Sequence, residues 1–202
     1  AEIPLSYAQR RLWFLDRLEG GGEGEGSATY VIPLAVRLKG ELDRAALLGA
    51  LQDVVERHES LRTIFPERHG VPRQEILPTS GVRVGLAIER VSAGSVAEAL
   101  SLSARRGFDL SREVPLRAHL FELSGDEHVL LLVLHHIAGD GWSLGPLGRD
   151  LSRFYDARRS GVSAGLEPLS VQYADYTLWQ RAVLGEESDG GSAIARQLSF
   201  WK

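Results

Sequence analysis

The chain has no cysteine and no methionine, and only two of its basic residues, Lys39 and Lys202, are lysines. Without thiols it can form neither disulfides nor thiolate metal sites, so the sequence does not indicate a redox compartment. Because even position 1 is not methionine, we expect the chain to have been cut from a longer polypeptide.

Long apolar runs and clustered charges are also missing. The longest wholly apolar run, 129–134, is far too short to cross a membrane, and the first residues given do not resemble a basic and apolar signal peptide. The 23 basic and 27 acidic residues give a net charge of −4, with the arginines scattered. This balance argues against a nucleic-acid partner. With 202 residues, 44% of them apolar, we expect one soluble domain, located in the cytoplasm and bound to no membrane.

Hydrophobic periodicity and capping residues predict an α/β fold of the α+β type, a mixed sheet covered by helices. A capping box at Ser6 opens the first helix, Asp43 caps the second, and Gly161 ends a later one. The predicted helices are 6–18, 43–58, 95–106, 143–159, 170–184 and the tail to 202. The predicted strands are 30–38, 60–65, 82–88, 116–123 and 128–135.

The strand at 128–135 reads HVLLLVLH, with six apolar residues in succession. A strand of this kind is buried on both faces, so we expect it inside the sheet with helices above and below. The glycine-rich stretch 20–27 is predicted to be a flexible acidic loop, and 185–192 a linker. The Gly-x-Gly pattern in 20–27 does not indicate dinucleotide binding, because a helix precedes it and a strand follows it.

The chemistry-bearing residues gather in HHIAGDGWSLG, 135–145, at the exit of the buried strand, where α/β proteins usually place ligands. A metal site is disfavoured because adjacent strand residues point to opposite faces, and no third nitrogen or sulfur ligand lies nearby. A serine nucleophile elbow matches the letters GWSLG. However, all six histidines precede Ser143, whereas in that fold the triad histidine follows the serine. Ser143 is better interpreted as the N-cap of the next helix.

A third hypothesis is a histidine that assists acyl transfer without a covalent intermediate. One histidine of the pair would point into a cleft while the other turns inward. Asp140 would be buried in a tight loop and would need a cationic partner or several hydrogen-bond donors. Each residue could instead be only structural, but their joint occurrence favours a functional site.

Together these segments resemble the condensation domains of non-ribosomal peptide synthetases. HHIAGDGWS at 135–143 matches the HHxxxDG signature of that family. Four further segments are similar to family motifs and occur in the family's order, so the resemblance covers nearly the whole chain. They are LSYAQRRLWFLDRL at 5–18, RHESLRTIF at 57–65, FDLSREVPLRAHL at 108–120 and VQYADYTLWQR at 171–181.

The resemblance implies a chloramphenicol-acetyltransferase-like fold of two lobes with a tunnel between them. This chain would be the N-terminal lobe, 1–202, and its own C-terminal lobe would be missing. The reaction implied is amide formation: the amine of an acceptor aminoacyl thioester attacks a donor aminoacyl or peptidyl thioester. Both substrates would ride on phosphopantetheine arms of upstream and downstream peptidyl carrier proteins, with an adenylation domain as neighbour. The lobe itself would bind no cofactor and no metal.

The resemblance also assigns roles within the loop. His136 would orient the acceptor amine and take its proton. A free α-amine is partly neutral at pH 7, so no strong base is needed. His135 would point inward and support the backbone. Asp140 would form an ion pair with Arg62 that shapes the loop, and such a pair, if buried, would be costly to break on one side.

Three further loop residues complete the predicted site. Gly141 would let the backbone approach the phosphopantetheine arm, and its amide could face the developing oxyanion. Trp142 is predicted to be a wall or core residue, and Ser143 to contact the arm or substrate. The aromatic side chains of the helix at 170–184 are predicted to pack against the lobe.

Within the family, the two histidines disfavour cyclization domains, and the DGWS continuation disfavours epimerization domains. The segment SYAQRRLWFL resembles the subtype that joins two L-residues. Two alternatives remain: an O-acyltransferase of the same superfamily using coenzyme A or a carrier, and a non-catalytic lobe that only docks carriers. We expect the isolated lobe to fold but not to turn over, because half a tunnel cannot hold two arms.

Overall fold

The computed structural model of the chain describes residues 2–20 and 26–201. Most of the loop predicted at 20–27 lies outside the described residues. None of the described helices is long and apolar enough to cross a membrane.

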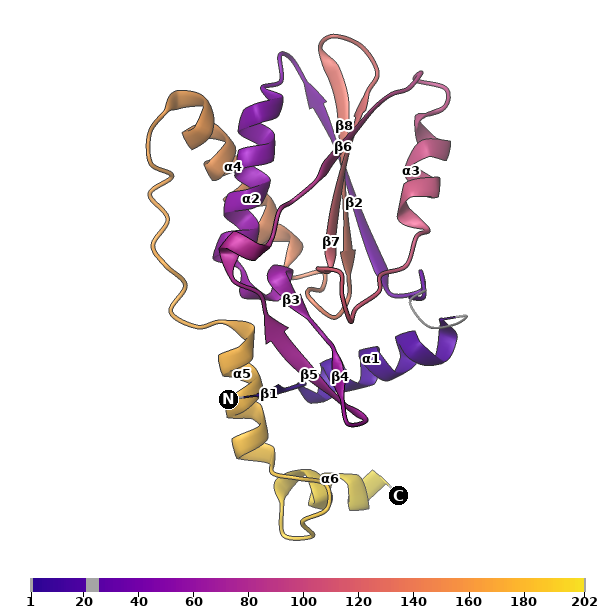
Figure 1. The fold of residues 1–202 in the computed structure, drawn as a ribbon, viewed down its shortest axis with the longest axis vertical. Helices are drawn as coiled ribbons and strands as arrows, with labels where there is room; N and C mark the ends of the chain where they lie inside the picture. The colour runs from indigo at the N-terminus through magenta and orange to yellow at the C-terminus, as the bar shows by residue number, and fades with distance from the viewer. Residues whose placement is uncertain (1, 21–25, 202) are drawn as a thin grey trace.

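A four-stranded mixed sheet forms the centre of the molecule (Figure 1). Its order is β2 (Val31–Lys39), β8 (Glu127–His135), β7 (Leu116–Glu122) and β6 (Leu86–Arg90). Neighbouring strands are antiparallel except β6 and β7, which are parallel. As predicted, the apolar strand β8 is an inner strand, and all its residues after Glu127 are buried.

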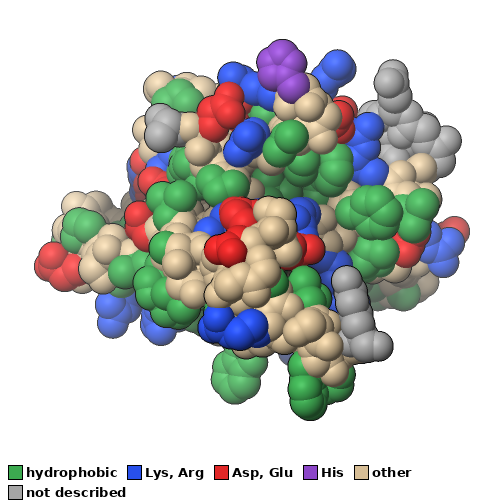
Figure 2. All heavy atoms as spheres, turned by 90° about the horizontal axis from the view of Figure 1, so that it is seen from below, with side chains coloured by type: hydrophobic (Ala, Val, Ile, Leu, Met, Phe, Trp, Pro, Cys, Tyr) green, Lys and Arg blue, Asp and Glu red, His purple; other side chains and the backbone are tan. Residues whose placement is uncertain are grey.

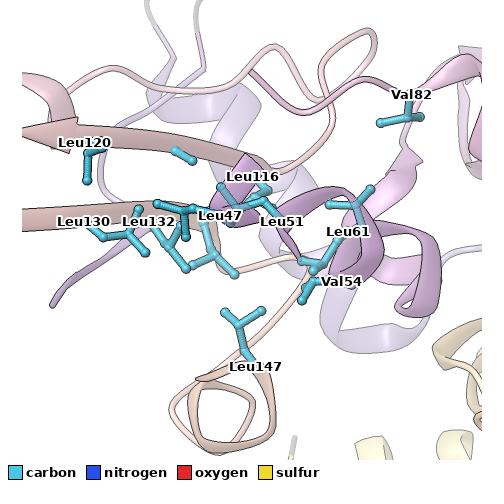
Figure 3. Close-up of a cluster of buried hydrophobic side chains, with 13 residues drawn as sticks. Leu47, Leu51, Val54, Leu61, Val82, Leu116, Leu120, Leu130, Leu132 and Leu147 are labelled. Atoms are coloured by element: carbon cyan, nitrogen blue, oxygen red, sulfur yellow. The ribbon is translucent and has the colours of Figure 1, made fainter. Parts of the chain in front are cut away.

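Helices cover both faces of this sheet, as Figure 1 shows. On one face α2 (Arg44–Arg57) and α4 (Leu144–Ser160) pack against the strands. Their leucine and valine side chains interdigitate with alternate residues of β7 and β8 in a cluster drawn in Figure 3. On the other face, α3 (Val96–Ala104) and the segment around Phe108 close a second core over the remaining side chains of β8.

The helix α1 (Tyr7–Glu19) lies across the end of the sheet where β8 finishes (Figure 1). It begins at the predicted capping box: Gln9 N donates to Ser6 Oγ at 3.1 Å, and Ser6 N donates to Gln9 Oε1 at 3.0 Å. These bonds satisfy two backbone donors that would otherwise be orphaned at the helix start. The capping box therefore sets the first residue of α1 at Tyr7.

A second, smaller sheet lies beside α1 and was not predicted. It consists of β1 (Ile3–Pro4), β3 (Thr63–Ile64), β4 (Glu67–Arg68) and β5 (Val71–Ile76). The chain ends with α5 (Tyr173–Leu184) and α6 (Ala193–Trp201). Gln74 of β5 donates to Pro4 O and to Thr177 Oγ1, and so ties this sheet to α5.

Two predicted strands are only partly correct. The segment 59–62 is a 3₁₀ turn (Glu59–Arg62) that leads into the short strand β3, in place of one strand over 60–65. Another short 3₁₀ turn, Thr79–Gly81, precedes irregular backbone, so the strand predicted at 82–88 begins only at Leu86. Val82 and Val84 still pack into the core, which explains why their alternation resembled a strand.

Candidate active site

The loop 136–143 joins the end of β8 to the start of α4 above α1. Two backbone bonds hold its first turn in place: His136 N donates to Tyr30 O at 2.8 Å, and Ala138 N donates to His135 O at 3.0 Å. The loop therefore leaves the sheet next to the beginning of β2. This places the signature residues at the edge of the sheet where the sequence predicted a site.

His135 turns inward, as predicted. Its side chain is fully buried, and its Nδ1 accepts the backbone N–H of Ile137 at 3.1 Å. The ring of Phe108 meets it edge-on, with 6.1 Å between centroids, and Tyr30 lies at 6.4 Å. The other ring nitrogen, Nε2, lies 3.4 Å from Oδ1 of Asp16 in α1. This buried imidazole therefore supports the loop and cannot reach a substrate.

His136 points the other way and is exposed to solvent. The opposite directions follow from the alternation of side chains at the end of a strand. Asp140 lies close enough for His136 to lower the pKa of its carboxyl slightly, although the hydrogen bonds of Ser143 are the main cause of that lowering. The loop thus presents one accessible imidazole.

The predicted ion pair between Asp140 and Arg62 is not formed. Asp140 is exposed, and its Oδ1 accepts Ser143 N at 3.0 Å and Ser143 Oγ at 2.7 Å. Arg62 instead donates to Leu77 O at 2.6 Å and contacts Glu59 at 3.3 Å. The prediction failed because Asp140 finds its donors three residues away, in its own turn, and remains in water where no charged partner is required.

A buried cluster of charged side chains surrounds Asp150, which sequence reasoning missed. This side chain of α4 is 1% exposed. It accepts Arg57 Nε at 3.0 Å, contacts His58 Nε2 at 2.9 Å and lies 3.3 Å from Arg149 Nε. Burial alone would raise the pKa of Asp150, but the hydrogen bonds from His58 and Arg57 outweigh it and hold the pKa below its usual value.

This cluster connects the helix after the loop to the end of α2. Arg57 and His58 open the segment RHESLRTIF, so the signal was present in the sequence, but it was assigned to Arg62. Gln172, at the start of α5, adds two more bonds, donating to Arg57 O at 3.0 Å and accepting from Glu59 N at 3.2 Å. The buried ion pairs predicted for Asp140 are thus found ten residues later, at Asp150.

The structure corrects two further predictions. Trp142 is 91% exposed and so is not a core residue. Ser143 stands at the N-cap position of α4, but its hydroxyl makes no capping bond and instead joins the turn of Asp140. At Gly141 an added Cβ would meet nothing within 4 Å. Nothing within the described chain therefore requires glycine there.

The aromatic face of α5 is not packed in the way that was predicted. Tyr176 is 39% and Trp179 60% exposed, and only Tyr173 is largely covered. Its hydroxyl lies 3.0 Å from Ser6 Oγ. Burial raises the pKa of the Tyr173 phenol, and the nearby charge of Asp140 adds a smaller increase. The start of α5 therefore lies next to the loop.

Within residues 2–20 and 26–201, no three His, Asp or Glu side chains come together in a way that could hold a metal ion. The loop presents the exposed imidazole of His136, and the buried side chain of the adjacent His135 supports the turn that carries it. That arrangement suits orientation of a nucleophile and proton transfer.

The sequence matches the Condensation domain family over residues 1–202, and the chain belongs to that family. It is 54% identical over 200 residues to the nonribosomal peptide synthetase CymA of Salinispora arenicola, covering 99% of this chain and 2% of that protein. It is 53% identical over 201 residues to a dimodular nonribosomal peptide synthase of Bacillus subtilis, covering 100% of this chain and 8% of that protein. The chain thus spans only a small part of these relatives.

Solved structures agree with this assignment. The X-domain from teicoplanin biosynthesis is 38% identical, with a TM-score of 0.86, and the match covers 99% of this chain and 42% of that one. The same X-domain has also been solved in complex with OxyB. The first condensation domain of the calcium-dependent antibiotic synthetase is 25% identical, with a TM-score of 0.76, and the match covers 100% of this chain and 47% of that one. The chain therefore has the chloramphenicol-acetyltransferase-like fold of condensation domains and matches less than half of each of these two solved structures.

Proposed function

We propose that this chain is the N-terminal lobe of a condensation domain and supplies the imidazole that assists peptide-bond formation. A donor aminoacyl or peptidyl thioester and an acceptor aminoacyl thioester, both carried on peptidyl carrier proteins, are the substrates. The observation that carries the proposal is that His136 is exposed while the adjacent His135 is fully buried.

In this mechanism the acceptor amine attacks the thioester carbonyl next to His136. The new C–N bond forms and the amine proton passes to the imidazole; as the C–S bond breaks, the imidazolium gives that proton to the departing sulfur, which leaves as the carrier thiol. A neutral amine is already available at pH 7, so His136 needs to do no more than orient it and accept the proton. Gly141, with open space at its Cβ position, leaves room for the phosphopantetheine arm, beside Trp142 and Ser143.

The partner of this lobe is a second lobe of similar size. The chain covers 42% and 47% of the two solved structures described above. It also exposes large side chains that a monomer would rarely leave in water. These are Phe14, Leu18, Trp179, Phe200 and Trp201. Figure 2 shows the lower end of the molecule, where exposed hydrophobic side chains stand in several groups among charged ones.

The finer assignments follow the same proposal. The start of α1 supports the subtype that joins two L-residues, the neighbouring domain is an adenylation domain, and the synthetase is cytoplasmic. The lobe binds no cofactor of its own, since both substrates arrive on carrier arms.

The test uses the complete domain that contains these residues. A donor carrier loaded with an L-aminoacyl thioester is mixed with an acceptor carrier bearing an L-amino acid, and the products are followed by mass spectrometry. The proposal predicts a dipeptidyl thioester on the acceptor carrier. A parallel acceptor bearing a hydroxy acid should react far more slowly; preferential ester formation would overturn amide synthesis in favour of O-acyl transfer.

A second candidate function is docking without catalysis, which the likeness to the X-domain favours, since that domain forms a complex with OxyB. In the same assay, a docking lobe would bind carriers or partner proteins but give no product with either acceptor.

A further inference from the structure

Asp16 is a buried acid that the mechanism above does not use. It lies in α1, is 5% exposed, and its Oδ1 accepts the backbone N–H of Ser27 at 3.0 Å. The same oxygen lies 3.4 Å from Nε2 of His135, within reach of electrostatic attraction although the geometry is not that of a hydrogen bond. Burying a carboxylate is costly unless it has partners, so its place beside His135 calls for an explanation.

The tautomer of His135 follows from its other nitrogen. Nδ1 accepts the N–H of Ile137 at 3.1 Å, so it carries no hydrogen, and in the neutral ring the hydrogen must sit on Nε2. The carboxylate of Asp16, 3.4 Å from Nε2, stabilises a hydrogen on that nitrogen electrostatically. The opposite tautomer would place two hydrogens against each other and leave the amide of Ile137, a buried residue, without an acceptor.

The hydrogen bond from Ile137 N to His135 Nδ1 bears directly on His136, because His136 lies between these two residues in the chain. The backbone of His136 is held on one side by its own N–H to Tyr30 O at 2.8 Å, and on the other by the bond from Ile137 N to His135 Nδ1. If His135 changed its tautomer, the hydrogen bond from Ile137 N to Nδ1 would be lost, and the backbone of His136 would be held on one side only. Misplacing a catalytic group by about 1 Å can cost ~10²-fold in rate.

We propose that Asp16 is a positioning residue for peptide-bond formation. Its carboxylate keeps His135 in the Nε2–H tautomer, and His135 in turn fixes the turn that presents His136. The inference rests on the function proposed above for His136 and adds a residue from a different helix, 119 positions earlier in the chain than His135. It also gives α1, through Asp16, a role in the active site besides packing.

Two variants of the complete domain test it, both assayed for dipeptide formation with loaded carriers. Asp16→Asn keeps an oxygen that can accept from Ser27 N and that lies near His135 Nε2, and should retain kcat within about threefold. Asp16→Leu keeps the branch at Cγ but offers no acceptor, and should lower kcat about 10- to 100-fold with unchanged KM for both carriers. Arg17→Ala, at the next position of α1 and half exposed, is the matched control and should leave kcat unchanged.

A long-range ¹H–¹⁵N spectrum of histidine-labelled domain reads the tautomer directly and does not depend on turnover. The wild type and Asp16→Asn should show His135 with hydrogen on Nε2 and a bare Nδ1, whereas Asp16→Leu should show a mixed or altered pattern. Wild-type His135 with hydrogen on Nδ1 would overturn the inference even if Asp16→Leu fails to fold. So would a folded Asp16→Leu domain with full kcat. If the wild type makes no dipeptide at all, the proposed function fails, while the spectrum still decides whether Asp16 controls His135.

Discussion

At the scale of single residues, the direction of each side chain in the HHxxxDG loop decides its role. His135 and His136 are neighbours in the chain, yet one is fully buried and the other lies in solvent. The alternation at the end of a strand allows the sequence to predict that the two point apart. It does not predict where Asp140 turns, because the Asp–Ser bonds within a turn depend on local backbone geometry that the motif does not encode.

The carboxylates at 140 and 150 should differ strongly in their effect on stability. Asp150→Ala leaves Arg57 and His58 facing an empty buried site and should lower the free energy of unfolding by about 3–5 kcal/mol. Asp140→Ala removes only bonds within an exposed turn and should cost about 1 kcal/mol. Urea denaturation followed by circular dichroism measures both.

Asp156→Ala, an exposed acid of the same helix α4, is the control and should stay within about 0.5 kcal/mol of the wild type. A larger loss for Asp140→Ala than for Asp150→Ala would restore the predicted clamp at Asp140 and contradict the cluster that the structure shows.

Acid stability should depend on Asp150 in a defined direction. The hydrogen bonds of His58 and Arg57 lower its folded pKa below the usual value of 3.8, so its contribution is fully present above that pH. The contribution is lost as the pH falls through the folded pKa. Asp150→Asn removes this titration, and the slope of unfolding free energy against pH below about pH 4 should be shallower than in the wild type. Equal slopes would show that Asp150 does not take up a proton on unfolding.

At the scale of helices and strands, the predictions succeeded where local signals were strong. The capping box at Ser6, the cap at Asp43 and the stop at Gly161 set helix limits within about two residues of those observed. The short strand β5 was missed because its charged and proline-containing sequence, VPRQEI, has no apolar alternation. Its pairing with β1 and β3 depends on contacts between distant segments, which single-sequence patterns do not carry.

The capping box also predicts a measurable contribution to stability. Ser6→Ala removes the acceptor of Gln9 N and the contact with the Tyr173 hydroxyl, and should cost about 1–2 kcal/mol. Ser101→Ala, an exposed change inside α3, should be neutral or slightly stabilising, since alanine favours helix interiors. Thermal unfolding gives the melting temperature of each variant. If Ser6→Ala melts at the same temperature as Ser101→Ala, the cap does not stabilise the protein.

At the scale of the whole molecule, the chain covers less than half of each of the two solved structures described above. The helix α5 packs through Ala174 and Thr177, whereas its aromatic residues Tyr176 and Trp179, which were predicted to pack, are exposed. A sequence pattern shows that a face is apolar, but it does not show whether the covering surface lies within the same chain. Residues 1–202 alone should therefore bind loaded carriers weakly and make no dipeptide, which mass spectrometry of the carrier-bound product can check.

The same experiment could also contradict this prediction. Dipeptide made by residues 1–202 at a rate comparable to the complete domain would show that no second wall is needed to exclude water or hold the two arms.

The central claim is that the imidazole of His136 takes part in the reaction, and its most direct test is the single-turnover rate of dipeptide formation by the complete domain. His136→Ala should lower that rate about 10²- to 10⁴-fold while the melting temperature and the carrier affinities stay unchanged, because the side chain is exposed and supports nothing else. A His136→Ala domain that forms dipeptide at the wild-type rate would contradict the account.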